Sequence, residues 1–108
     1  WFTMDYGANP SFKITRMTGM ATWRTGTGNF YLYGTNDISN VGGNDGSSDA
    51  GSLNTTGLTQ IFNVSNPAVN WDSGYQSSDY YRYYVYRITS SGSYDWGWDM
   101  SKWYGDYY

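Results

Sequence analysis

The sequence predicts an all-β fold, and three observations lead to that prediction. Short runs of bulky β-favouring residues recur along the chain, most clearly at residues 30–33 (FYLY) and 80–89 (YYRYYVYRIT). Clusters of Gly, Asn, Asp, Ser and Thr separate these runs, as at residues 34–37 (GTND). No segment shows the apolar spacing of an amphipathic helix. Several short strands separated by turns are typical of an all-β domain, and a chain of 108 residues predicts one domain with a modest core.

The first twenty residues predict two strands. Residues 1–6 alternate loosely and end at a turn signal, residues 7–10 (GANP). In the second strand, residues 12–17, one face carries Phe12, Ile14 and Arg16, and the intervening residues form the other face. Gly19 is expected to interrupt this strand.

The stretch at residues 23–37 (WRTGTGNFYLYGTND) organises the rest of the chain. Its first half, residues 24–29, is predicted to be a Gly/Thr loop that carries a permanent cation, Arg24, and an amide, Asn29. Its second half, residues 30–33, is predicted to be a buried strand. Recognition groups often lie on loops held by a rigid scaffold, so this loop is the candidate site of function.

A long polar segment follows at residues 38–60, rich in Gly, Ser, Asn, Asp and Thr. It holds few apolar residues, so we expect a surface loop that contributes little to the core. Asn44, Asp45 and Asp49 could supply oxygen ligands to Ca²⁺, although their spacing does not match an EF-hand loop. A solvated loop without a metal ion is the alternative, and no metal site is assigned.

The second half of the chain predicts one short strand, one strong strand and an aromatic C-terminal segment. Residues 61–64 (IFNV) form the short strand, and residues 71–79 are expected to be a polar loop. Residues 80–89 carry aromatics on both faces, which predicts a central strand covered on both sides. Near the end, Trp96 and Trp98 alternate with polar residues as in a strand, and Gly105-Asp106 is expected to close it.

The composition narrows the possible functions. The chain has no Cys and no His, so it lacks thiolate ligands and the commonest general base. Its acids lie mostly in Gly/Ser-rich loops, where they act as turn formers, so neither an enzyme nor a cofactor is expected. A net charge of -3 with six Lys plus Arg argues against nucleic acid as a partner. No apolar run approaches the ~20 residues that span a bilayer, so membrane insertion is not expected.

Three motifs resemble the discoidin family, also called the coagulation factor 5/8 type C or galactose-binding-like domain. Residues 33–37 (YGTND) resemble the family's "YGSND" turn, and a loop with Arg and then Asn precedes them. Residues 1–7 (WFTMDYG) resemble its early W-x-x-x-D-x-G strand, and residues 81–88 (YRYYVYRI) resemble its late "RYxR" strand. The matches keep the family's order and span most of the chain. The resemblance implies a β-sandwich of jelly-roll type with recognition loops gathered at one end.

The resemblance also implies a ligand site. In sugar-binding members an Arg and an Asn on the equivalent loop contact the ligand, so this role carries over to Arg24 and Asn29. The adjacent Trp23 would stack on a sugar ring. A sugar site needs such donors, an amide and an aromatic plane. The alternative is structural: Arg24 pairs with a nearby carboxylate, Asn29 forms a turn beside Gly28, and Trp23 packs in the core.

We therefore expect residues 1–108 to form one discoidin-like domain, a module or fragment of a larger protein, that binds carbohydrate or mediates adhesion without catalysis. A Tyr-, Gly-, Ser- and Asn-rich chain without Cys suits a virion or bacterial surface, and hence an extracellular or virion-surface location. The expected ligand is a glycan or a cell-surface polysaccharide. The alternative is a structural or decoration module of a bacteriophage tail, fibre or capsid, with other subunits as its partners.

Overall fold

The computed structural model is all-β, which confirms the predicted fold class. It describes residues 2–20, 23–24, 27–37, 39, 53, 55–65, 70–91, 94–95 and 102–107. Within these ranges no α-helix occurs. The strands are β1 (Phe2–Asp5), β2 (Phe12–Met20), β3 (Trp23–Arg24), β4 (Thr27–Thr35), β5 (Thr59–Ser65), β6 (Asn70–Asp72), β7 (Tyr83–Ser91), β8 (Tyr94–Asp95) and β9 (Lys102–Tyr107).

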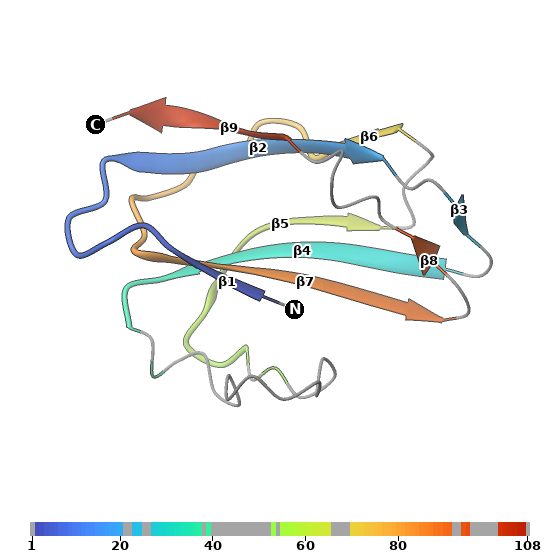
Figure 1. Ribbon diagram of the computed structural model, residues 1–108, viewed down its shortest axis with the longest axis horizontal. Helices are drawn as coiled ribbons and strands as arrows, with labels where there is room; N and C mark the ends of the chain where they lie inside the picture. The colour runs from blue at the N-terminus through green and yellow to red at the C-terminus, as the bar shows by residue number, and fades with distance from the viewer. Residues whose placement is uncertain are drawn as a thin grey trace.

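The strands form two main layers and a small ribbon (Figure 1). One layer is a four-stranded sheet in the order β1-β7-β4-β5, and the other is a three-stranded sheet in the order β6-β2-β9. All of the strand pairs are antiparallel. The ribbon, β3 with β8, lies at one end of the two layers (Figure 1). The arrangement is therefore sandwich-like, with one face of each sheet turned towards the other.

The main core fills the space between the two sheets. In the four-stranded sheet, the ring of Phe30 packs against the ring of Tyr86, with 4.0 Å between the two centroids. From the other layer, Trp71 reaches the same Phe30 ring at 4.7 Å. The buried members of this core are Ile14, Met17, Phe30, Leu32, Ile61, Phe62, Trp71, Tyr84 and Tyr86. Aromatic rings supply most of its volume, which accounts for a stable core in a chain with few aliphatic residues.

Strand β7 is central and covered on both faces, as its sequence predicts. It lies between β1 and β4, and its four residues from Tyr83 to Tyr86 are all buried. Tyr84 and Tyr86 face the core between the sheets. Val85 faces the opposite way and packs with Tyr33 and Leu53 in a second, smaller cluster.

Leu53 corrects the expectation that residues 38–60 contribute little to the core. Only 7% of Leu53 is exposed, and it packs against the outer face of the four-stranded sheet. Leu58 packs beside it, half-buried. The returning end of this segment therefore covers part of that face, and residues 59–60 already belong to β5. The Asn44, Asp45 and Asp49 candidates lie outside the described residues.

Strand β2 departs from the simple alternation that the sequence predicts. Its register against β9 shifts between Ile14 and Arg16, which marks a β-bulge. Because a bulge resets the alternation of side chains, Ile14 and Met17 both face the core although their numbers differ by three. Arg16 consequently faces outward rather than sharing a face with Ile14.

Gly19 does not interrupt β2, which continues to Met20. A Cβ atom at position 19 would lie 2.5 Å from the Trp71 ring. The glycine therefore lets the indole pack closely against the strand. Trp71 itself lies in β6 and is 6% exposed, so its prediction as part of a polar loop is wrong.

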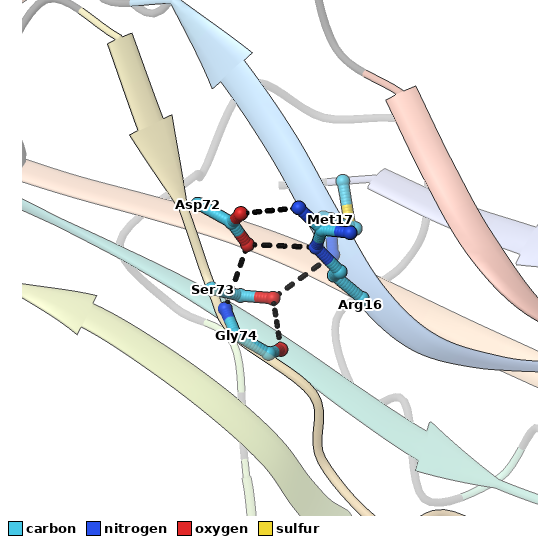
Figure 2. Close-up of polar contacts among 5 residues, drawn as sticks. All are labelled: Arg16, Met17, Asp72, Ser73 and Gly74. Carbon is cyan, nitrogen blue, oxygen red and sulfur yellow. Dashed lines mark hydrogen bonds and ion pairs between the residues drawn. The ribbon is translucent and has the colours of Figure 1, made fainter.

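A polar clamp fixes β6 to the outer side of β2 (Figure 2). Arg16 donates two hydrogen bonds to the Asp72 carboxylate, at 2.9 Å from Nε and 2.5 Å from Nη2. Gly74 N–H donates to the same carboxylate at 2.8 Å, and Met17 N–H donates to Ser73 Oγ at 2.9 Å. Arg16 first and Gly74 second lower the pKa of Asp72 to about 2.

A second ion pair joins β1 to the start of β7 in the four-stranded sheet. Arg82 donates from Nε and Nη2 to Asp5, at 3.0 and 3.1 Å, and this hydrogen bonding lowers the pKa of Asp5. The Arg82 backbone also accepts from Tyr6 N–H at 2.7 Å and donates to Asn36 Oδ1 at 2.9 Å. These contacts fix Arg82 just before β7, which begins at Tyr83 rather than at Tyr80 as the sequence predicts.

The C-terminal strand also differs from its prediction. Gly105 and Asp106 do not close the strand but lie inside β9, which runs to Tyr107. A Cβ atom at position 105 would collide with the Lys13 carbonyl, so glycine permits a close approach of β9 to β2. Trp96 and Trp98 lie outside the described residues.

Candidate functional site

Four side chains gather on the outer face of the four-stranded sheet, away from the core. Phe30 and Leu32 of β4 are fully buried between the sheets, so the alternating residues Asn29 and Tyr31 face outward. Tyr31 stands directly opposite Asn63 of β5 on one side and Arg87 of β7 on the other. We call Asn29, Tyr31, Asn63 and Arg87 the outer-face cluster.

The arginine of this cluster differs from the two arginines in the ion pairs. Arg16 and Arg82 each bind an aspartate through two hydrogen bonds. Arg87 has no ion pair within the described ranges, and its buried Nε atom has no hydrogen-bond partner there. Its guanidinium carbon lies 5.9 Å from the centroid of the Tyr31 ring. Donors of Arg87 are therefore not committed to a carboxylate of the described residues.

Aromatic rings form the floor beside this cation. The rings of Tyr31 and Tyr33 stack at 6.0 Å between centroids with an interplanar angle of 14°. Tyr33 is buried by the returning Leu53 segment, whereas Tyr31 stays half-buried. The cluster thus lies next to the covered part of the face.

The cluster offers the chemistry that a hydroxyl-rich ligand needs. Asn29 and Asn63 each supply an amide donor and an amide acceptor, and Arg87 supplies fixed donors. Tyr31 supplies an aromatic ring of the kind that packs against C–H faces. Asn63 is exposed, while Asn29, Tyr31 and Arg87 are half-buried, so the groups are held by packing yet reach the surface.

The structure separates the three site residues that the sequence predicts. Asn29 lies within β4 rather than on a loop, because the strand begins at Thr27, and the ladder pairs Asn29 with Ser65. Trp23 and Arg24 form β3, where the backbone places them opposite Asp95 and Tyr94 of β8. The loop prediction for residues 24–29 is therefore wrong at both ends. Asn29 belongs to the outer-face cluster, and the side chains of Trp23 and Arg24 lie outside what the structure describes.

Sequence reasoning missed Tyr31, Asn63 and Arg87 as site residues. The sequence does carry a signal for Tyr31. Alternate residues of a strand share a face, so Asn29 and Tyr31 lie on the face opposite to Phe30 and Leu32. The partners on β5 and β7 depend on strand register, which links positions more than 20 residues apart. Register of that range is not readable from local sequence.

A hollow of about 420 Å³ lies at the connection between β1 and β2. Its lining consists of Ala8, Asn9, Pro10, Ser11 and Tyr80. Lys13 extends towards it, with Nζ 5.1 Å from the centroid of the Tyr80 ring. The hollow is open to solvent, and its lining side chains offer one amide and two hydroxyl groups, from Asn9, Ser11 and Tyr80, but no cation.

The acidic side chains of the described residues are dispersed rather than grouped. No group of three or more Asp, Glu, His or Cys side chains gathers anywhere in the described part of the chain. Asp37, one of the acids of the turn after β4, accepts from the hydroxyl and backbone N–H of Ser39, and these bonds lower its pKa. The described segments also include no helix with the length and apolarity to cross a bilayer.

Comparison with known proteins finds no match among protein-family models, curated proteins or solved structures. The class of this chain therefore stands on its own geometry: an all-β, sandwich-like domain with a polar and aromatic cluster on one outer face. Membership of the discoidin family stays a prediction.

Proposed function

We propose that the chain is a non-catalytic carbohydrate-binding module, with the outer-face cluster as its glycan site. The observation that carries the proposal is Arg87, whose guanidinium lies over the Tyr31 ring without a carboxylate partner among the described residues. Asn63 stands opposite Tyr31 across the ladder, and Asn29 lies two residues before Tyr31 on the same strand. A guanidinium, two amides and a ring together match the hydroxyls and C–H faces of a sugar.

We also propose a jelly-roll topology of discoidin type, which the three motifs suggest. Display on a virion or bacterial surface, with a cell-surface polysaccharide as ligand, suits a Cys-free chain with 13 Tyr and 6 Trp. Trp23 and Arg24 lie on β3, near the end of the sheet where β4 begins (Figure 1), and are proposed only as secondary contacts of the ligand. Glycan binding without chemistry requires no nucleophile and no general base.

A glycan array probed with the labelled chain tests the proposal. We expect saturable binding to at least one class of glycan, and loss of that signal in Tyr31→Ala and Asn63→Ala. Tyr75→Ala is the matched control, because Tyr75 is 68% exposed on the connection between β6 and β7, away from the cluster. No binding to any glycan, or equal loss in the control, would refute the proposed function.

A structural or decoration module of a larger assembly is the second candidate, and one observation favours it. Three aromatic residues of β9 are exposed: Trp103 at 38%, Tyr104 at 42% and Tyr107 at 81%. Exposed aromatics of this kind are enriched at subunit interfaces. Assembly through β9 with no glycan binding would favour this candidate over the first.

A further inference from the structure

Strand β9 is the edge of the three-stranded sheet among the described strands. It pairs with β2 on one side, and no described strand pairs with its other side. An edge strand presents unpaired backbone N–H and C=O groups that can add another strand. Its sequence, KWYGDY, contains no proline and no bulge of its own that would block such pairing. Its free side is thus a template for antiparallel addition.

The outward face of β9 carries a symmetric pattern of charge. Tyr104 stands opposite Arg16, Lys102 opposite Thr18, and Asp106 opposite Lys13. Since Arg16 faces away from the core, Lys102, Tyr104 and Asp106 share the outward face. Lys102 and Asp106 are both exposed, and neither takes part in an ion pair in the ranges that the structure covers.

We infer that β9 pairs antiparallel with β9 of a second copy of this chain, about a two-fold axis through Tyr104. In that register, Lys102 of each copy stands opposite Asp106 of the other, and the two Tyr104 rings meet at the axis. Directly opposed charges of opposite sign stabilise an antiparallel pair. Trp103 stands opposite Gly105 of the second copy, where the missing side chain leaves room for the indole. One strand thereby supplies two ion pairs and a continuous sheet across both copies.

This register is favoured over shifted registers for two reasons: it pairs opposite charges, and it keeps outward side chains opposite outward side chains. A two-fold axis normal to the sheet keeps outward residues opposite outward residues, so only shifts by two residues are allowed. Shifting by two in either direction separates Lys102 from Asp106 and shortens the ladder. The pairing in which all of residues 102–106 are matched is the one that joins the charges. Arg16, whose guanidinium carbon is 5.2 Å from the Tyr104 ring centroid, packs against that ring from the β2 side, away from the axis.

The inference goes beyond glycan binding and does not depend on it. The outer-face cluster belongs to the other layer, on strands β4, β5 and β7. Pairing through β9 therefore leaves that cluster open in both copies. A failure of glycan binding and a failure of self-association are separate results, because they are measured on different strands with different variants.

Sedimentation velocity over a concentration series tests the charge pattern, since one paired strand is at the small end of stable interfaces. Asp106→Lys places Lys against Lys twice, and Lys102→Asp places Asp against Asp twice. We expect each variant to weaken self-association by roughly ten- to a hundredfold. The double swap Lys102→Asp/Asp106→Lys restores opposite charges and should restore the dimer. Asp79→Lys is the matched control, with the same charge change at an exposed site off β9.

Single cysteines test the register, because the natural chain has no Cys. Opposed residues in an antiparallel pair have Cα atoms about 4.5–5.5 Å apart, within the range that a disulfide bridges. Tyr104→Cys should therefore crosslink into a dimer under mild oxidation. Lys102→Cys and Asp106→Cys should not, since four residue steps put each of them about 14 Å from its own copy.

A wild-type chain that stays monomeric at the highest soluble concentration would overturn the inference. So would single charge reversals that dimerise like the wild type, or a double swap that stays as weak as either single variant. Crosslinking that is strongest at position 102 or 106 would overturn the register.

Discussion

At the scale of single residues, the three arginines with described side chains have different roles. Arg16 attaches β6 to β2 through Asp72, and Arg82 attaches β1 to the start of β7 through Asp5. Within the described residues, Arg87 makes neither kind of contact, and it lies over the Tyr31 ring. Exposed ion pairs contribute little to stability, so the clamps act mainly by fixing where strands meet. Arg87 is the arginine whose removal should change binding rather than structure.

Arg87→Ala is expected to lower glycan affinity by about ten- to a hundredfold, the effect of losing one charged hydrogen bond worth roughly 1.5–3 kcal/mol. The free energy of unfolding should change by less than ~1 kcal/mol, because Arg87 forms no ion pair with any of the described residues. Isothermal titration and urea unfolding measure the two quantities. Arg16→Ala is the matched control: it removes a guanidinium from the other layer and should leave affinity unchanged. Equal affinity loss in both variants would contradict the assignment of Arg87.

The Asp72 clamp predicts a specific dependence of stability on pH. Hydrogen bonds from Arg16 and Gly74 lower the Asp72 pKa from 3.8 to about 2 in the folded state. A carboxyl group whose pKa is lower in the folded state stabilises the fold at any pH above its unfolded-state pKa. This contribution is lost as the pH falls through the folded-state pKa. The melting temperature should therefore drop between about pH 4 and pH 2, and drop less in Asp72→Asn. Parallel curves for the two proteins would show that the clamp contributes nothing.

At the scale of elements, local sequence predicted which segments are strands better than it predicted their faces and ends. Strands are present over residues 30–33 and 61–64, and over residues 83–89 of the predicted 80–89, because runs of β-branched and aromatic residues suit a pleated, half-buried surface. The bulge in β2 and the burial of Trp71 were not predicted. The bulge depends on how β2 pairs with β9 in the same sheet, and the burial of Trp71 depends on its contact with Phe30 of the other sheet, so neither follows from local sequence.

Gly19 shows most clearly how the packing of β6 constrains the sequence of β2. A methyl group at this position would lie 2.5 Å from the buried Trp71 ring, which has little room to move. Gly19→Ala should lower the free energy of unfolding by about 1–3 kcal/mol, the usual cost of overpacking. Thr18→Ala, one residue away on the outward face, should cost well under 1 kcal/mol. Urea unfolding compares them, and similar values for the two would argue against close packing of Trp71 on β2.

Leu53 assigns a structural role to one end of the long polar segment. It is 7% exposed and packs with Tyr33 and Val85, so Leu53→Ala should cost about 2–5 kcal/mol. Excision of residues 41–52 leaves Leu53 in place and should be tolerated, because the cost of loop length changes slowly. Thermal unfolding of both variants provides the comparison. A deletion that unfolds the protein while Leu53→Ala does not would reverse this account.

At the scale of the whole molecule, the two sheets divide the proposed functions between them. The four-stranded sheet carries the outer-face cluster, and the three-stranded sheet carries the exposed edge β9. The sequence predicted the all-β class and a polar-aromatic recognition site. It put the site on a loop, whereas the proposed site lies on a sheet face. Asn29 belongs to both the predicted and the proposed site, because the alternation of side chains along a strand is enough to assign its face. Asn63 and Arg87 could be assigned only once the register between strands was known.

A titration of the ¹⁵N-labelled chain with the glycan that binds best on the array, followed by backbone amide shifts, locates the binding surface. We expect the largest saturable shifts at Asn29, Tyr31, Asn63 and Arg87, on three adjacent strands. Largest shifts at the β3–β8 ribbon, or around the hollow lined by Asn9 and Tyr80, would contradict it and move the site to one end of the molecule.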